Sequence, residues 1–124
     1  MKVVNLEMVA VQAVAHDPEI LKRVLLYESE LPCSVRLWQA TLTPGQQVSA
    51  HHHEHICEVF YLLSGEGEFI IDGETVEVGE GSTIRIDAGE VHAVVNSSDK
   101  DMSLLYFGLP AKKKSPARKG GALD

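Results

Sequence analysis

The sequence has few cysteines and no long apolar run. Its two cysteines, Cys33 and Cys57, lie far apart and form no Cys-x-x-Cys pair, so neither a disulfide framework nor a cysteine zinc site is expected. Asn5, Glu7 and Gln12 interrupt the apolar start of the chain, which argues against a signal segment or a membrane span there. We therefore expect a protein of the reducing cytoplasm with no membrane partner.

Basic residues are also scarce, except near the end of the chain. The net charge is -7, and residues 112–124 hold five basic residues and one acid, so this segment is +4 and residues 1–111 are -11. An acidic body repels the phosphate backbone, so nucleic acid is not expected as a partner. With 44% hydrophobic and 23% charged residues, the 124-residue chain can form one core. We predict one domain over residues 1–110 and a basic, disordered tail over 111–124.

Helix signals are nearly absent. An N-cap residue, a proline and an acid at 17–19 predict one short helical turn that ends near Lys22. Valines at 3–15 favour a strand, and the rest of the chain alternates short strand patterns with turn residues such as Asp72-Gly73. The other predicted strands are 23–27, 34–43, 47–53, 58–63, 66–71, 75–78, 83–86, 91–96 and 102–108. This pattern predicts an all-β sandwich or barrel.

Histidines are crowded, because four of the six fall within residues 51–55. Alternate residues of a strand share a face, so His51 and His53 should point together while His52 points away. Glu58 heads the next strand and shares its face with Phe60. With His92, this mixed nitrogen and oxygen set suits Mn, Fe, Ni, Cu or Zn. Four protein ligands on an ion that accepts six leave two positions for water or a chelating substrate.

The spacing of these residues resembles both signature motifs of the cupin superfamily. The first motif is carried by Gly45, His51, His53, Glu58 and Gly65, and the second by Gly81, Gly89, His92 and Asn96. The sequence departs from the second motif at one place, since Asp87 stands where the family has proline. The missing proline weakens the preset turn but does not remove a ligand.

The resemblance implies a cupin jelly-roll β-barrel of two antiparallel sheets. It implies one divalent transition metal ion (Mn, Fe, Ni or Zn) whose ligands are His51, His53, Glu58 and His92. It also implies a homodimer, because small members of this family pack their sheets together or exchange an N-terminal strand, a role that residues 3–14 would fill here.

The residues leave the activity open. One hypothesis is a metal-dependent isomerase, lyase or dioxygenase acting on a small oxygen-rich molecule, such as a sugar derivative, keto acid or diol. The alternatives are a barrel that binds or senses a small molecule without turnover, and a structural barrel that mainly forms a dimer. Glu54, His55 and Tyr106 are candidate general bases by position or residue type alone.

The sequence also suggests which other residues face the pocket, the core or solvent. Phe60 is the preferred pocket residue, whereas core packing is expected for the other strand aromatics. We expect Arg36 and Arg85 to face solvent, although an inward arginine would pair with a substrate carboxylate or phosphate. His55 should lie at the mouth of the loop, the alternative being that it joins or replaces a ligand if the strand continues through Glu54. Cys57 should be structural, since it would face away from an ion beside Glu58.

Overall fold

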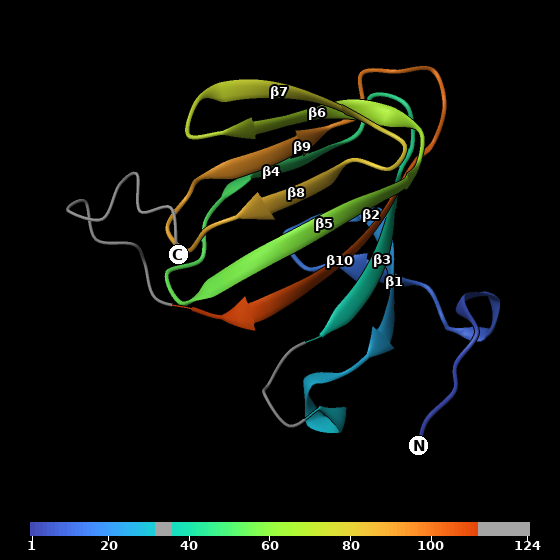
Figure 1. The fold of residues 1–124 in the computed structure, drawn as a ribbon. Helices are drawn as coiled ribbons and strands as arrows, with labels where there is room; N and C mark the ends of the chain where they lie inside the picture. Colours follow the sequence, from blue (N-terminus) through green and yellow to red (C-terminus); the bar gives the residue numbers. More distant parts are fainter. Residues whose placement is uncertain (32–35, 112–124) are drawn as a thin grey trace.

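The computed structural model describes residues 1–31 and 36–111, and within them the chain is almost entirely β-strand (Figure 1). Cys33 and the predicted basic tail at 112–124 lie outside the described residues. The strands form two antiparallel sheets, which confirms the predicted all-β class. Only two short 3-10 turns interrupt the strands of the described chain, and both are too short to cross a bilayer.

The larger sheet has six strands in the order β1-β2-β3-β10-β5-β8. Their bounds are Gln12–Val14, Asp17–Leu26, Leu37–Leu42, Met102–Pro110, Ile56–Ser64 and Thr83–Ile86, given in sheet order. The smaller sheet has the order β4-β9-β6-β7. Its strands span Gln47–His51, His92–Val95, Glu66–Ile71 and Glu74–Gly79. The ladder between β6 and β7 pairs Ile71 with Glu74, so the hairpin turns at Asp72-Gly73 as predicted.

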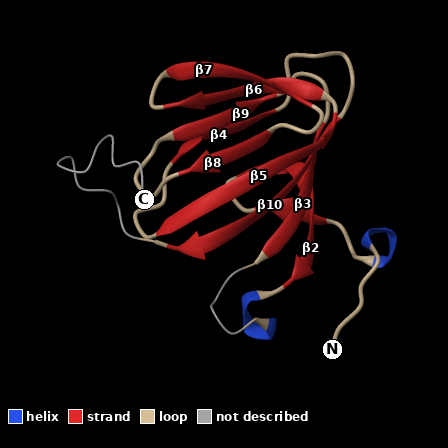
Figure 2. Ribbon diagram, viewed as in Figure 1, coloured by secondary structure: helices blue, strands red, loops and turns tan. Residues whose placement is uncertain are grey.

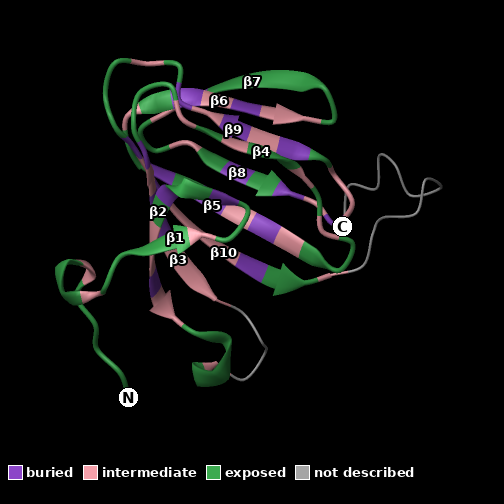
Figure 3. Ribbon diagram, turned by 180° about the vertical axis from the view of Figure 1, so that it is seen from behind, coloured by how far each residue is buried: buried purple, intermediate pink, exposed green. Residues whose placement is uncertain are grey.

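The two sheets face each other with the core between them (Figure 1). Burial alternates along β5, where Glu58, Phe60 and Leu62 are buried, and Figure 3 shows the same alternation on several strands. No strand ladder joins one sheet to the other in the described part of the chain, so the barrel of the predicted jelly roll is not closed. The two sheets are thus joined mainly by burial of their apolar inner faces and not by a strand ladder.

The predicted helical turn after Asp17 is wrong. Residues 17–26 form β2, which pairs with β1 on one side and β3 on the other. The carboxylate of Asp17 does not cap a helix; it accepts hydrogen bonds from Ser49, 32 positions away. A long-range acceptor role therefore overrides the local capping signal.

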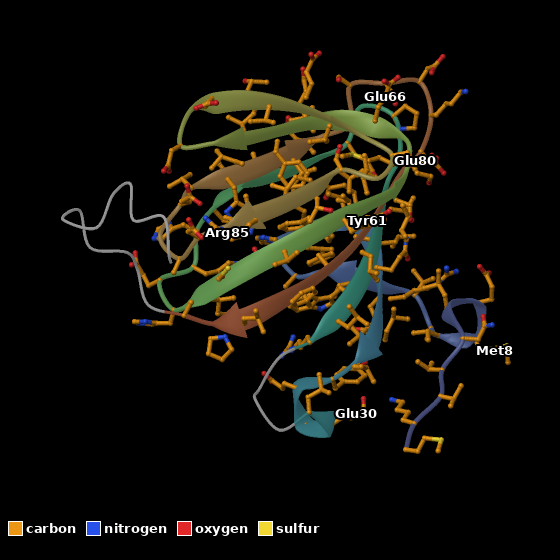
Figure 4. The ribbon with its side chains drawn as sticks, viewed as in Figure 1. Met8, Glu30, Tyr61, Glu66, Glu80 and Arg85 are labelled. Carbon is orange, nitrogen blue, oxygen red and sulfur yellow. The ribbon has the colours of Figure 1, made fainter. Side chains whose placement is uncertain are left out.

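The N-terminal strand is much shorter than expected. The strand covers only Gln12–Val14, and Leu6–Met8 forms a 3-10 turn, η1, whose N-cap Asn5 accepts a hydrogen bond from the Glu7 N–H. Figure 4 shows Met8 away from both sheets, and Figure 2 shows η1 and the second turn, η2 (Glu28–Glu30), outside them. The valines before residue 12 lack a neighbouring strand among the described residues, so β-propensity alone does not form a ladder there.

Candidate metal centre and ligand pocket

The fold brings the four predicted ligands together from both sheets. His51 ends β4 and is the register partner of His92, which begins β9. Glu58 lies on β5 of the other sheet, and His53 follows β4 by two residues. One ligand atom from each of these four residues lies within 4.8 Å of all the others. The cluster thus forms at the point where the sheets approach each other.

Backbone carbonyls fix the orientation of two of the imidazoles. His51 Nδ1 lies 2.8 Å from the carbonyl oxygen of Ser49, and His92 Nδ1 lies 3.0 Å from that of Glu90. When Nδ1–H donates to a carbonyl, Nε2 keeps its lone pair for a metal ion. Metal-binding histidines ordinarily make such a hydrogen bond through the ring nitrogen that does not bind the metal, and both His51 and His92 are placed to make it.

The distances within the cluster fit one transition metal ion. His92 Nε2 lies 3.1 Å from Glu58 Oε1, and His53 Nε2 lies 3.7 Å from the same oxygen. Around an ion with bonds of about 2.1 Å, neighbouring ligand atoms are about 3.0 Å apart and opposite ones about 4.2 Å. The set needs only a small contraction to match, and three imidazoles with one carboxylate suit Mn, Fe, Ni, Cu or Zn.

Electrostatics distinguishes two of the histidines. Burial lowers the pKa of His51, which has no carboxylate in hydrogen-bonding contact. Burial alone would also lower the pKa of His92, but the hydrogen bond to Glu58 and the Glu90 carbonyl together raise it. Glu58 is 6% exposed and His92 is 1% exposed. A buried carboxylate that needs a positive partner is a strong reason to place a cation here.

A pocket of about 620 Å³ opens directly from this cluster. Phe60 lines the pocket as predicted, and Trp38 and Tyr106, for which core packing was the default expectation, line it too. Burial and the charge of Glu58 raise the pKa of Tyr106, so its phenol stays protonated and can donate a hydrogen bond to a ligand but does not act as a base.

The remaining candidates divide between the pocket and the outer surface. His55 is exposed and lines the pocket, consistent with a place at the mouth of the loop. Glu54 instead lies 3.1 Å from exposed His52, at the surface. Arg85, on β8 in Figure 4, faces solvent and pairs with Asp87 at 2.9 Å.

The structure refines the expectation for Arg36 and adds residues that the sequence did not single out. Arg36 lines the pocket while its side chain stays 40% exposed, so it meets both the pocket and solvent. His16 also lines the pocket, with its ring centroid 4.7 Å from that of His51, and Lys22 lines it from β2. His16 lies outside both motifs, directly before β2, and Lys22 was assigned to a helical turn, so the local sequence pattern indicates neither residue.

A jelly-roll fold of two antiparallel sheets, with a histidine and glutamate cluster between them, defines a class of small β-proteins that bind ligands inside. Residues 38–108 match the family model of the cupin domain, which covers more than half of the chain. This protein therefore belongs to the cupin family.

Three known proteins illustrate the similarity. The "Oxalate-binding protein" of Thermotoga maritima is 38% identical over 64 residues, which cover 52% of this chain and 53% of that protein. The chain thus matches about half the length of that relative. A crystal structure described as a predicted oxalate decarboxylase from Thermotoga maritima has a TM-score of 0.82 and 25% identity, covering 88% of this chain and 99% of that one. The polyketide cyclase RemF from Streptomyces resistomycificus has a TM-score of 0.77 and 26% identity, covering 93% and 82%.

Proposed function

We propose that this protein binds one divalent transition metal ion through His51, His53, Glu58 and His92, and acts there on a small oxygen-rich molecule. The observation that carries the proposal is the convergence of four ligand atoms, all within 4.8 Å of one another, at the wall of a 620 Å³ pocket. Bound there, the ion would supply Lewis acidity to an oxygen of the substrate. A metal site that opens onto a pocket suits substrate binding better than a closed structural site.

The chain's own residues would shape the environment of the reacting molecule. The buried carboxylate of Glu58 offsets the charge of the ion, and the protonated phenol of Tyr106 donates a hydrogen bond toward the pocket. Phe60, beside Glu58 on the same face of β5, excludes water from that side. These features support isomerase, lyase or dioxygenase chemistry without selecting one of them.

Capture of a small molecule without turnover is the second candidate. The Thermotoga maritima relative is named an oxalate-binding protein, which favours this candidate. The two candidates share the metal site and differ only in whether product forms. Incubation of the metal-loaded protein with sugar acids, keto acids, catechols and oxalate, followed by mass spectrometry, separates them.

The metal site is tested by elemental analysis of the purified protein and of two variants. We expect about one ion per chain in the wild type. His92→Ala should lower metal affinity by at least about 100-fold, since loss of a group that merely supports a ligand already costs about 10–100-fold. His52→Ala is the matched control, because His52 is exposed and pairs with Glu54 instead. A wild-type protein that takes up no Mn, Fe, Ni or Zn would overturn the proposal.

A further inference from the structure

Two basic side chains line the pocket of this acidic protein. Arg36 Nη2 donates a hydrogen bond to Glu28 Oε1 at 2.9 Å, and its guanidinium carbon lies 5.9 Å from the centre of the Trp38 ring. Lys22, in contrast, makes no ion pair with any described residue. Burial and the nearby charge of Arg36 both lower the pKa of Lys22. The charge of Arg36 therefore acts on Lys22, and the carboxylate of Glu28 pairs with Arg36 alone.

An aromatic row lies between Lys22 and the metal cluster. Trp38, Tyr106 and Phe60 are register partners on β3, β10 and β5. Their rings are stacked, with centroids 4.8 Å apart for the first pair and 4.9 Å for the second. Because the stack runs along the sheet, the ring edges face the pocket above it. Ring edges carry partial positive charge and attract the π-face of another aromatic ring.

The position of the row relative to the cluster is set by the strands. Phe60 lies two residues from Glu58 on β5, which is about 6.6 Å along the strand. A molecule held at the metal cluster therefore reaches the aromatic row over that distance. Lys22 pairs with Ala40, two residues beyond Trp38 on β3. The metal cluster, the ring edges and Lys22 thus follow one another across the inner face of the larger sheet, and Arg36 lies beside Trp38.

The size of the pocket also bears on its ligand. A cavity of about 620 Å³ lies within the range of about 300–1,000 Å³ that is usual for drug-sized ligands. A dianion of six non-hydrogen atoms, such as oxalate, would occupy the metal end alone. The aromatic row and Lys22 would then have no partner.

We propose that the pocket binds a planar aromatic acid, with two chelating oxygens at the metal cluster, its ring over the edges of Phe60, Tyr106 and Trp38, and its carboxylate at Lys22 and Arg36. This inference rests on the proposed metal site and defines the class of molecule that the site takes. The carboxylate meets the unpaired ammonium, the ring covers the apolar row, and the oxygens complete the coordination of the ion.

The test uses the full chain loaded with Zn²⁺, an ion without redox chemistry, so that bound catechols stay intact. Isothermal titration calorimetry compares 3,4-dihydroxycinnamate with catechol, which lacks the carboxylate, and with oxalate, which lacks the ring. We expect 3,4-dihydroxycinnamate to bind at least about tenfold more tightly than either probe. One charge-assisted hydrogen bond to its carboxylate is enough to strengthen binding by about that factor. Trp38 is the only tryptophan, so its fluorescence should report binding of the ring independently.

Variants locate the carboxylate. Lys22→Gln and Arg36→Gln should each weaken 3,4-dihydroxycinnamate about tenfold and leave catechol unchanged. Lys100→Gln is the control, because Lys100 is exposed and does not line the pocket. Thermal unfolding of each variant checks that it folds.

The outcomes separate this inference from the proposed function. If Zn²⁺ binds but oxalate or catechol binds as tightly as 3,4-dihydroxycinnamate, or if no probe binds, the inference is overturned while the metal site stands. The same holds if both cation variants retain wild-type affinity for the acid. If Zn²⁺ itself does not bind, the proposed function fails, and the inference fails with it.

Discussion

Gly65 lies directly against the backbone of Asp101. A Cβ atom at Gly65 would be 2.4 Å from the Asp101 carbonyl oxygen and 2.9 Å from the Cα of Met102, and the φ of Gly65 is +88°. Gly65 is the single residue between β5 and β6, so it connects the larger sheet to the smaller one. The final glycine of the first cupin motif is thus required by close approach as well as by backbone conformation.

Replacing this glycine should destabilise the protein strongly. Gly65→Ala places its methyl group against main-chain atoms that cannot rotate away, so we expect a loss of about 3 kcal/mol or more in the free energy of unfolding. Gly45→Ala is the matched control, because Gly45 has a φ of +86° but no atom lies near the position of an added Cβ. Backbone strain should then be the only cost of this variant, about 1–2 kcal/mol in the free energy of unfolding. Urea unfolding measures both; equal losses would contradict the role of Asp101.

The sequence singles out the four candidate ligands because their spacing is local to two short segments, 45–65 and 81–96. Strand alternation groups His51 with His53, although β4 ends at His51 and is shorter than the predicted 47–53, and the bounds of β6 and β8 are found as predicted. Residues that depend on pairing between distant strands are not predictable in this way. Lys22 and Trp38 line the pocket only because β2, β3 and β10 are neighbours, an order that no local pattern encodes.

Asp17 illustrates the same limit and supports a second prediction. Its carboxylate is 4% exposed and accepts hydrogen bonds from the Ser49 N–H at 3.1 Å and the Ser49 hydroxyl at 2.6 Å. Ser49 in turn accepts from His51 Nδ1, so Asp17 on one sheet positions a candidate ligand on the other. We expect Asp17→Ala to cost about 2–3 kcal/mol of stability and about tenfold in metal affinity, measured by unfolding and by calorimetry.

Two comparisons make the Asp17 experiment specific. Asp17→Asn keeps one acceptor oxygen and should recover part of the metal affinity, as expected for a positioning residue. Glu77→Ala removes an exposed carboxylate on β7 and should change neither quantity. A metal affinity that falls equally in Asp17→Ala and Glu77→Ala would show that only the net charge matters.

The N-terminal segment gives a prediction about assembly. Val3, Met8 and Val11 are 88%, 84% and 48% exposed, next to β1 at the edge of the larger sheet. Exposed apolar residues beside an open edge strand favour pairing with a second chain. We expect light scattering to give the mass of a dimer for the full chain and of a monomer after deletion of residues 1–11. Equal masses before and after the deletion would place any dimer contact elsewhere.

Removal of the metal should lower thermal stability. An ion that binds only the folded state adds about 2.7 kcal/mol when its concentration is 100 times its Kd, which corresponds to about 10 °C in Tm for a domain of this size. The effect should arise at Glu58, because a buried carboxylate loses its cation when a chelator removes the ion. Differential scanning calorimetry with and without a chelator measures this shift.

The His92→Ala variant shows whether the stabilisation comes from this site. It should unfold at the same temperature with and without the chelator, since it lacks the imidazole that contacts Glu58 at 3.1 Å. His52→Ala, whose imidazole pairs with Glu54 at the surface, should keep the full chelator-dependent shift. A shift that persists in His92→Ala would mean that a stabilising ion binds elsewhere in the chain, and the four residues between the sheets would then not be its ligands.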